Sequence, residues 1–251
     1  MITSHTKPVT ALSQSERDDM YSLLSGHFLG TVREDFERDL AEKECVMFLR
    51  EGAGGKIVGF STLVCFSDIR VGTKEVAVIF SGDTVVLERY RSSFGFGAEI
   101  ARYFETIRER YPDRESYYVL TSKGWRTYKI LPFFFKSFYP NHRNDESSEI
   151  RGIMDAFCMF KFPEYYDERR GVLTSTAERQ RLRPETGDCA LPDRDDPNIL
   201  YFAERNPGYL EGDELVCIAS IAGKNLADGM LRFTRKSLPS LEKESVSCEG
   251  S

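Results

Sequence analysis

A turn with two glycines joins an apolar run to an amphipathic segment near the middle of the chain. Residues 75–87 are apolar at most interior positions, which is typical of a strand that is buried on both faces. The turn Arg-Ser-Ser-Phe-Gly-Phe-Gly at residues 91–97 follows almost at once, and the pattern after it predicts a helix. Backbone N–H groups and the positive dipole end at the start of a helix favour a phosphate. The pattern therefore indicates a ligand that carries a pyrophosphate.

Asp83 stands inside the same apolar run. Burial penalises the ionised form of a carboxyl group and raises its pKa, so a carboxylate in a buried strand is costly unless it is paired or used. We therefore predict that Asp83 is a general base. The alternative is a strand bulge at Gly82 and Asp83, with the carboxylate capping nearby backbone N–H groups.

A second candidate site follows the predicted strand at 117–121. Lys123, Arg126 and Lys129 flank a turn at the expected carboxyl end of the sheet, which is where open α/β sheets bind ligands. These residues could hold a substrate carboxylate, the phosphates of a cofactor or an acidic carrier protein. The alternative is a basic rim around Trp125, the only tryptophan, that binds no ligand.

Composition narrows the classes of function. A chain of 251 residues can bury one substantial core. Its net charge of −6 argues against a general nucleic-acid binder. The six cysteines and three histidines are scattered without metal-ligand spacing, so we expect no metal site and reduced thiols in a cytoplasmic protein. Neither a signal peptide nor a membrane-spanning run is apparent, so we expect no membrane association.

Periodicity predicts the elements along the chain. We expect a loose tail at 1–8, a short strand at 9–12, and helices that begin at the capping-box sequences 13–16 and 31–34. Strands are predicted at 45–49, 57–66, 75–87 and 117–121, with helices after the last two. The polar stretch around 141–148 divides a first domain at 9–145 from an extension at 146–235. The extension is expected to be largely helical, with a final helix at 211–221, and residues 236–251 to be disordered.

The order of these elements over residues 9–140 resembles the GNAT superfamily of acyl-CoA-dependent N-acyltransferases. The resemblance implies an α+β fold, with a mixed, mostly antiparallel central sheet flanked by helices, in a divergent branch with its own C-terminal extension. In that family an Arg/Gln-x-x-Gly-x-Gly/Ala turn after the fourth strand holds the pyrophosphate of coenzyme A. Here the turn is one residue longer, so Ser92 and not Arg91 stands in strict register. The implied coenzyme A residues are Val85, Val86, Arg91, Ser92, Ser93, Gly95 and Gly97.

The resemblance also implies a reaction. An amine of a small-molecule acceptor would directly attack acetyl-CoA or another acyl-CoA, with Asp83 taking the proton and Lys123, Trp125 and Arg126 binding the acceptor. Many family members carry a tyrosine on the last helix that protonates the departing thiolate, but Phe134 stands at that position here. Tyr128 and Tyr139 are the candidates for this role. Two alternatives stay open: an acyl carrier protein as donor, or a catalytically silent binding module.

Overall fold

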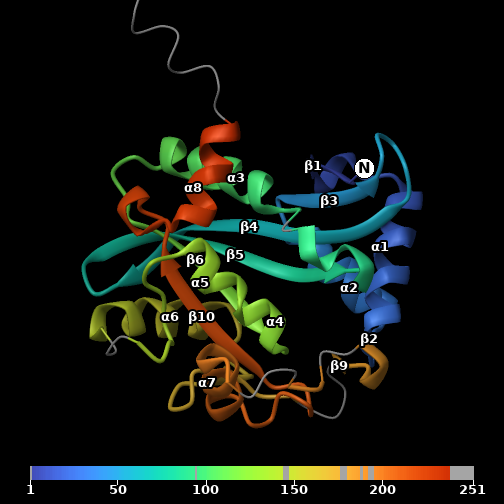
Figure 1. Cartoon of the computed structure of the whole chain (residues 1–251). Helices are drawn as coiled ribbons and strands as arrows, with labels where there is room; N and C mark the ends of the chain where they lie inside the picture. The colour runs from blue at the N-terminus through green and yellow to red at the C-terminus, as the bar shows by residue number, and fades with distance from the viewer. Residues whose placement is uncertain are drawn as a thin grey trace, which may run out of the picture.

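An eight-stranded sheet runs through the centre of the molecule (Figure 1). The computed structural model describes residues 2–93, 95–143, 147–175, 180–186, 189–191 and 195–237, without the side chains of 92, 93 and 235–237. Neighbouring strands pair antiparallel except β5 and β6, which run parallel, so the expected mixed, mostly antiparallel sheet is confirmed. In sheet order the strands are β1 (Ile2–Pro8), β3 (Cys45–Glu51), β4 (Ile57–Val71), β5 (Lys74–Val86), β6 (Ser116–Ser122), β10 (Glu214–Ser220), β8 (Val172–Leu173) and β7 (Tyr166–Asp167).

The first residues form an edge strand, so the expectation of a loose tail at 1–8 was wrong. β1 pairs with β3 over its whole length, from Ile2 opposite Glu51 to Pro8 opposite Cys45. An antiparallel edge strand has only one partner and can keep one face in water, which allows a mostly polar sequence. The strand expected just after it was also wrong, because residues Val9–Ala11 form a 3-10 turn.

The C-terminal extension contributes to the same sheet as the first part of the chain. β10 lies between β6 and β8 and pairs antiparallel with both, so the helix expected at 211–221 was wrong. Its side chains alternate between two cores, with Leu215 and Cys217 on one face and Val216 and Ile218 on the other. A strand buried on both faces reads as a continuous apolar run, which periodicity alone does not separate from a buried helix. The helices of the extension are α6 (Ser148–Lys161), α7 (Pro197–Arg205) and α8 (Asp228–Ser237), and most of the expected disordered tail lies outside the described residues.

Helices cover both faces of the sheet (Figure 1). α3 (Gly97–Arg110), α5 (Ile130–Phe134) and α8 lie over one face and share its core with Ile79 and Tyr118. α6 lies over the other face and shares its core with Val78. α1 (Gln14–His27) and α2 (Arg33–Ala41) enclose a third core near the end of β5. The predicted capping box at Ser13 is present, whereas α2 begins later than predicted, with Val32 at its N-cap position.

The sheet opens between β5 and β6. The two strands pair from Ala77 opposite Ser116 to Ser81 opposite Leu120. Beyond this point β5 pairs with β4 and the end of β6 pairs with β10. The β4–β5 ladder is interrupted at the same place, because Leu63 faces Ser81 while Ser61 faces Thr84. Two residues of β5, at positions 82 and 83, thus stand against one of β4, which is a β-bulge that bends the strand.

Candidate active site

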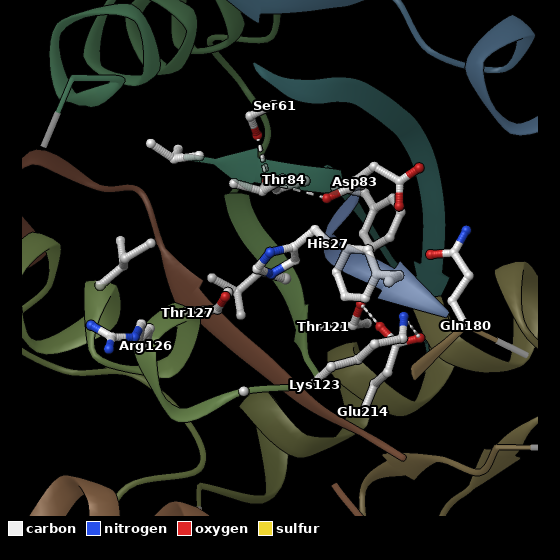
Figure 2. A pocket seen from close by; sticks show the side chains of 18 of the residues that line it. His27, Ser61, Asp83, Thr84, Thr121, Lys123, Arg126, Thr127, Gln180 and Glu214 are labelled. Atoms are coloured by element: carbon white, nitrogen blue, oxygen red, sulfur yellow. Dashed lines mark hydrogen bonds and ion pairs between the residues drawn. The ribbon is translucent and has the colours of Figure 1, made fainter. Parts of the chain in front are cut away.

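A cavity of about 710 Å³ opens where β5 and β6 part, and its lining comes from both faces of the sheet (Figure 2). We call one set of lining residues the α3-side wall, because it belongs to the core under α3; it includes Ser61, Ser81, Thr84, Phe96, Ile100 and Tyr118. We call the other set the α2-side wall; it includes Phe28, Val32, Asp35, Phe36, Arg38, Asp39, Glu42, Phe80, Asp83, Thr121, Lys123, Lys161, Phe162, Tyr165, Leu173, Gln180, Leu182 and Glu214. The cavity therefore reaches through the sheet at the bulge.

Asp83 occupies the bulge and lines the cavity, as Figure 2 shows. Glycine precedes it for a steric reason, since a Cβ at position 82 would lie 2.6 Å from Thr62 Oγ1 and 2.7 Å from Lys43 Cε. The Asp83 carboxylate makes no hydrogen bond or ion pair with any residue that the structure describes. Burial, with a further contribution from Asp39, raises the pKa of Asp83 to about 6, against the opposing effect of Lys123 and Lys43. The bulge of the alternative interpretation is present, but the carboxylate does not serve as a cap within the described chain.

Hydroxyl groups form a chain on the α3-side wall. Ser61 Oγ lies 2.7 Å from Thr84 Oγ1 and 3.3 Å from Ser81 Oγ. Ser81 in turn shares a hydrogen bond with the hydroxyl of Tyr118. Burial raises the pKa of Tyr118 to about 12, so its phenol keeps its proton at neutral pH. This group was not predicted from the sequence, although serines inside the otherwise apolar strands β4 and β5 were a visible signal.

Ion pairs neutralise most charges of the α2-side wall. Glu214 accepts hydrogen bonds from Lys123 Nζ at 2.7 Å and from Thr121 Oγ1 at 2.6 Å, and Figure 2 shows the three side chains together. Asp39 pairs with the buried amine of Lys43 at 2.5 Å. Lys123 therefore lines the cavity but is paired with Glu214. The sequence did not point to Glu214, because it lies in a segment that was expected to be a helix.

The glycine turn also reaches the cavity. Gly95 and Gly97 line it, and α3 begins at Gly97 with its N-terminus toward the α3-side wall. The ring of Phe233 on α8 fills the place where a Cβ of Gly97 would stand, at 2.3 to 2.6 Å. The packing of the extension therefore requires glycine at this position. The backbone of Ser92 and Ser93 lies in the 3-10 turn Glu88–Ser93, and their side chains are outside the description.

Arg91 lines the cavity and holds two segments of its wall together. Its Nε donates to the carbonyl of Val86 at 3.0 Å, and its Nη1 donates to the carbonyl of Thr186 at 3.2 Å. Its Nη2 lies 3.4 Å from Nδ1 of His27, a cavity residue at the end of α1 that the sequence analysis did not select. The guanidinium thus ties the end of β5 to the extension.

Trp125 and Arg126 line the cavity at the start of α4 (Trp125–Tyr128). The guanidinium carbon of Arg126 lies 4.4 Å from the centroid of a Trp125 ring. The indole N–H of Trp125 donates to the carbonyl of Ala190 at 3.0 Å, and Lys129 pairs with Asp196 at 2.7 Å. The basic turn is thus joined to the extension, and Lys123 and Lys129 are both neutralised there.

Of the predicted site residues whose side chains the structure describes, three lie away from the cavity lining. Val85 is buried in the core under α1 and α2, while its neighbour Val86 lines the cavity. Tyr128 is fully buried, and its hydroxyl donates to the carbonyl of Pro140 at 2.9 Å. Tyr139 packs in the core on the α6 face, where Arg151 donates to its hydroxyl at 2.9 Å. Neither tyrosine is brought together with Asp83, because both side chains point into cores.

In the described part of the chain, no cluster of three or more His, Cys, Asp or Glu side chains could hold a metal ion. Among the same residues, no helix has the length and apolar character needed to span a membrane.

Comparison with known proteins finds solved structures that are similar to this chain, but no similar sequence or family. No family model matches the sequence, and no curated protein matches it. A probable N-acyltransferase from Enterococcus faecalis V583 has a TM-score of 0.40 and 15% identity over 54% of this chain, which spans only 33% of that protein. The ribosomal-protein-S18-alanine N-acetyltransferase from Escherichia coli has a TM-score of 0.38 and 13% identity, covering 90% of this chain and 99% of that one.

A GNAT family N-acetyltransferase from Escherichia coli, solved in complex with CoA, has a TM-score of 0.33 and 11% identity, covering 49% of this chain and 64% of that one. These are similarities to solved structures at low sequence identity, and the resemblance to the GNAT superfamily stays a prediction.

Proposed function

We propose that the protein transfers an acyl group from an acyl thioester, with coenzyme A as the thiol, to a primary amine. The observation that carries the proposal is the cavity through the sheet at the bulge. It combines an unpaired carboxylate, Asp83, on one wall with hydroxyl groups and the start of α3 on the other. Such an arrangement lets an amine and a thioester approach each other from opposite faces of the sheet. Direct attack then needs no covalent enzyme intermediate.

Asp83 is the proposed general base. The amine nitrogen forms a bond to the carbonyl carbon of the thioester and passes its proton to the Asp83 carboxylate. A pKa of about 6 leaves this carboxylate largely ionised at neutral pH and close enough to the working pH to exchange protons readily. The bond from the carbonyl carbon to sulfur then breaks, which gives an amide and a thiol.

Tyr118 is the proposed general acid for the departing sulfur. It lines the cavity on the α3-side wall, holds its proton at neutral pH and is hydrogen-bonded to Ser81. The Ser81 and Ser61 hydroxyls offer a route by which its proton can be replaced from the cavity. Tyr118 thereby takes the role that the family resemblance assigns to a residue at the position of Phe134, in place of Tyr128 or Tyr139.

The start of α3 is the proposed site for the phosphates of coenzyme A. Gly95 and Gly97 line the cavity there, and a helix of this length presents free N–H groups and a positive dipole end. Arg91 supports this site by fixing the end of β5. Trp125 and Arg126 stand at the rim and are the proposed contacts for the remainder of the ligands.

Two measurements test the proposal. Acetyl-CoA should raise the melting temperature, because a ligand that binds only the native state stabilises it. Mass spectrometry should detect amide formation from acetyl-CoA and a primary amine. Asp83→Asn should lower turnover by about two to four orders of magnitude while keeping the thermal shift, and Asp68→Asn, at an exposed position of β4, is the matched control.

A flat thermal response to acetyl-, malonyl- and long-chain acyl-CoA would contradict coenzyme A as the donor. An acylated carrier protein would then be offered as the thioester. Amide formation with that donor alone would assign the carrier-protein alternative, and none with either donor would assign the silent binding module.

A further inference from the structure

Charges on the α2-side wall cancel in pairs, with one exception. Every other carboxylate on this wall has a basic partner, in the pairs Asp35–Arg38, Asp39–Lys43, Glu42–Lys161 and Glu214–Lys123. Asp83 alone has no partner among the described residues. The wall therefore offers a ligand one unpaired negative charge, and each lysine or arginine assigned to it is already neutralised.

The remainder of the α2-side wall is largely apolar and aromatic. Phe80 and Phe162 pack edge to face with ring centroids 5.5 Å apart, and Phe28 and Leu182 extend this surface along the small sheet of β2 (Phe28–Leu29) and β9 (Arg181–Leu182). Val32, at the N-cap of α2, is 45% exposed at the rim. A charged group that leaves water for such a surface loses hydration without gaining a partner.

We infer that the acceptor is a primary amine with a single positive charge and an apolar body such as an aromatic ring. This inference rests on the proposed function, since it names the substrate class for the same site. Asp83 receives the ammonium group, which loses one proton to solvent before the neutral nitrogen attacks, and the rings of the α2-side wall enclose the body. A carboxylate on the acceptor would find the cations of this wall engaged, and a second ammonium would lie against apolar side chains or disrupt an existing ion pair.

The test compares three amines that differ in charge. Phenethylamine has one ammonium and a ring, phenylalanine adds a carboxylate to the same skeleton, and hexamethylenediamine has a second ammonium and no ring. Phenethylamine should give the highest kcat/KM with acetyl-CoA, by about tenfold or more, because the other two bury an uncompensated charge. Calorimetry on the full-length protein should give the same order of affinities without turnover.

A substitution at Val32 should weaken this preference. Val32→Asp places a carboxylate on the rim at a helix N-cap, where aspartate is a preferred residue, so folding should be retained. The ratio of diamine to phenethylamine in kcat/KM, and in affinity, should rise by about two- to fivefold, the scale of an exposed ion pair. Val32→Asn is the matched control, because it offers the same capping chemistry without the charge and should leave the ratio unchanged.

The outcomes separate the inference from the proposed function. Acylation or binding that favours phenylalanine or the diamine in the unmodified protein would overturn the inference and leave the acyltransferase intact. Binding in the expected order without any amide product would support the acceptor class and count against the proposed reaction. An equal rise of the ratio in Val32→Asp and Val32→Asn would also overturn the inference, because charge would then not be the cause.

Discussion

Asp83 is a carboxylate inside a cavity without a partner among the described residues, and this placement lowers the stability of the native state by an amount that depends on pH. Its pKa of about 6 is above the ordinary aspartate value of 3.8, so the native state binds the proton more tightly than the unfolded chain does. Between about pH 4 and pH 6 the native state therefore holds more protons, and stability falls as the pH rises through this window. Above pH 6 the free energy of unfolding is reduced by the full amount.

We expect Asp83→Asn to be more stable than the unmodified protein above pH 6, by up to about 3 kcal/mol, a limit set by the size of the pKa shift. Near pH 3 the difference should vanish, because the carboxyl is then protonated in both states. Denaturant titration at several pH values gives these free energies of unfolding. A variant that is less stable at pH 7.5 would show that the carboxylate is instead a structural acceptor.

The proposed role of Tyr118 as general acid can be tested by changing the leaving group of the thioester. Tyr118→Phe keeps the ring that packs against Phe104 and removes only the hydroxyl. Turnover with acetyl-CoA should fall by about two orders of magnitude, the lower end of the usual scale for losing an acid. An aryl thioester, whose thiolate leaves without protonation, should be used nearly as well as by the unmodified protein. An equal loss with both donors would mean that Tyr118 serves the structure and not the proton transfer.

The sequence drew attention to Asp83, the proposed base, but not to Tyr118, the proposed acid. A carboxylate in an apolar strand is unusual whatever its surroundings, so its position in the chain was informative by itself. Tyr128 and Tyr139 were chosen for their nearness to a family motif, and both turn toward cores, where Pro140 and Arg151 satisfy their hydroxyls. The direction of a side chain depends on which face of its helix or strand packs against the sheet. Residue spacing does not reveal that face where a proline interrupts the pattern.

At the level of elements, the bulge in β5 determines where the sheet opens. Gly82→Ala would place a methyl group within 2.7 Å of Thr62 and Lys43. We expect a loss of about 1–3 kcal/mol in the free energy of unfolding, since overpacking forces neighbours to move, and a loss of turnover as Asp83 shifts. Gly26→Ala, near the end of α1 with nothing within 4 Å of its added Cβ, is the matched control and should be neutral or stabilising.

Two of the strands that sequence reasoning missed, β1 and β10, were missed for a related physical reason. β3, β4, β5 and β6 were predicted because their apolar runs lie between clear turns. β1 lies at an edge, so its polar sequence carries little signal, and β10 is buried on both faces, so its apolar run resembles a helix. In each case the partner strand decides the conformation, through β3 for β1 and through β6 for β10. A single segment does not contain that information.

At the scale of the whole molecule, the extension belongs to the same sheet as the first 143 residues. β10 covers β6 from Leu215 opposite Ser122 to Ser220 opposite Tyr117, and α8 packs on α3 and α5. We expect a chain that ends at Arg143 to lose cooperative unfolding, because β6 would expose an unpaired apolar edge. Circular dichroism during thermal melting should show one transition for the full chain and none for the shortened one. A cooperative transition in the shortened chain would instead support the separate domain expected at 9–145.

Trp125 gives the molecule a built-in optical reporter. It is the only tryptophan in the chain, it lines the cavity, and its indole N–H is held by the carbonyl of Ala190. Intrinsic fluorescence that is excited at wavelengths absorbed only by tryptophan therefore originates at this site. Ligands that enter beside Trp125 will alter the polarity or quenching around one fluorophore, so affinities can be read from an unlabelled protein in dilute solution. Tyr118→Phe, Val32→Asp and Asp83→Asn leave this signal in place, which makes the variants directly comparable.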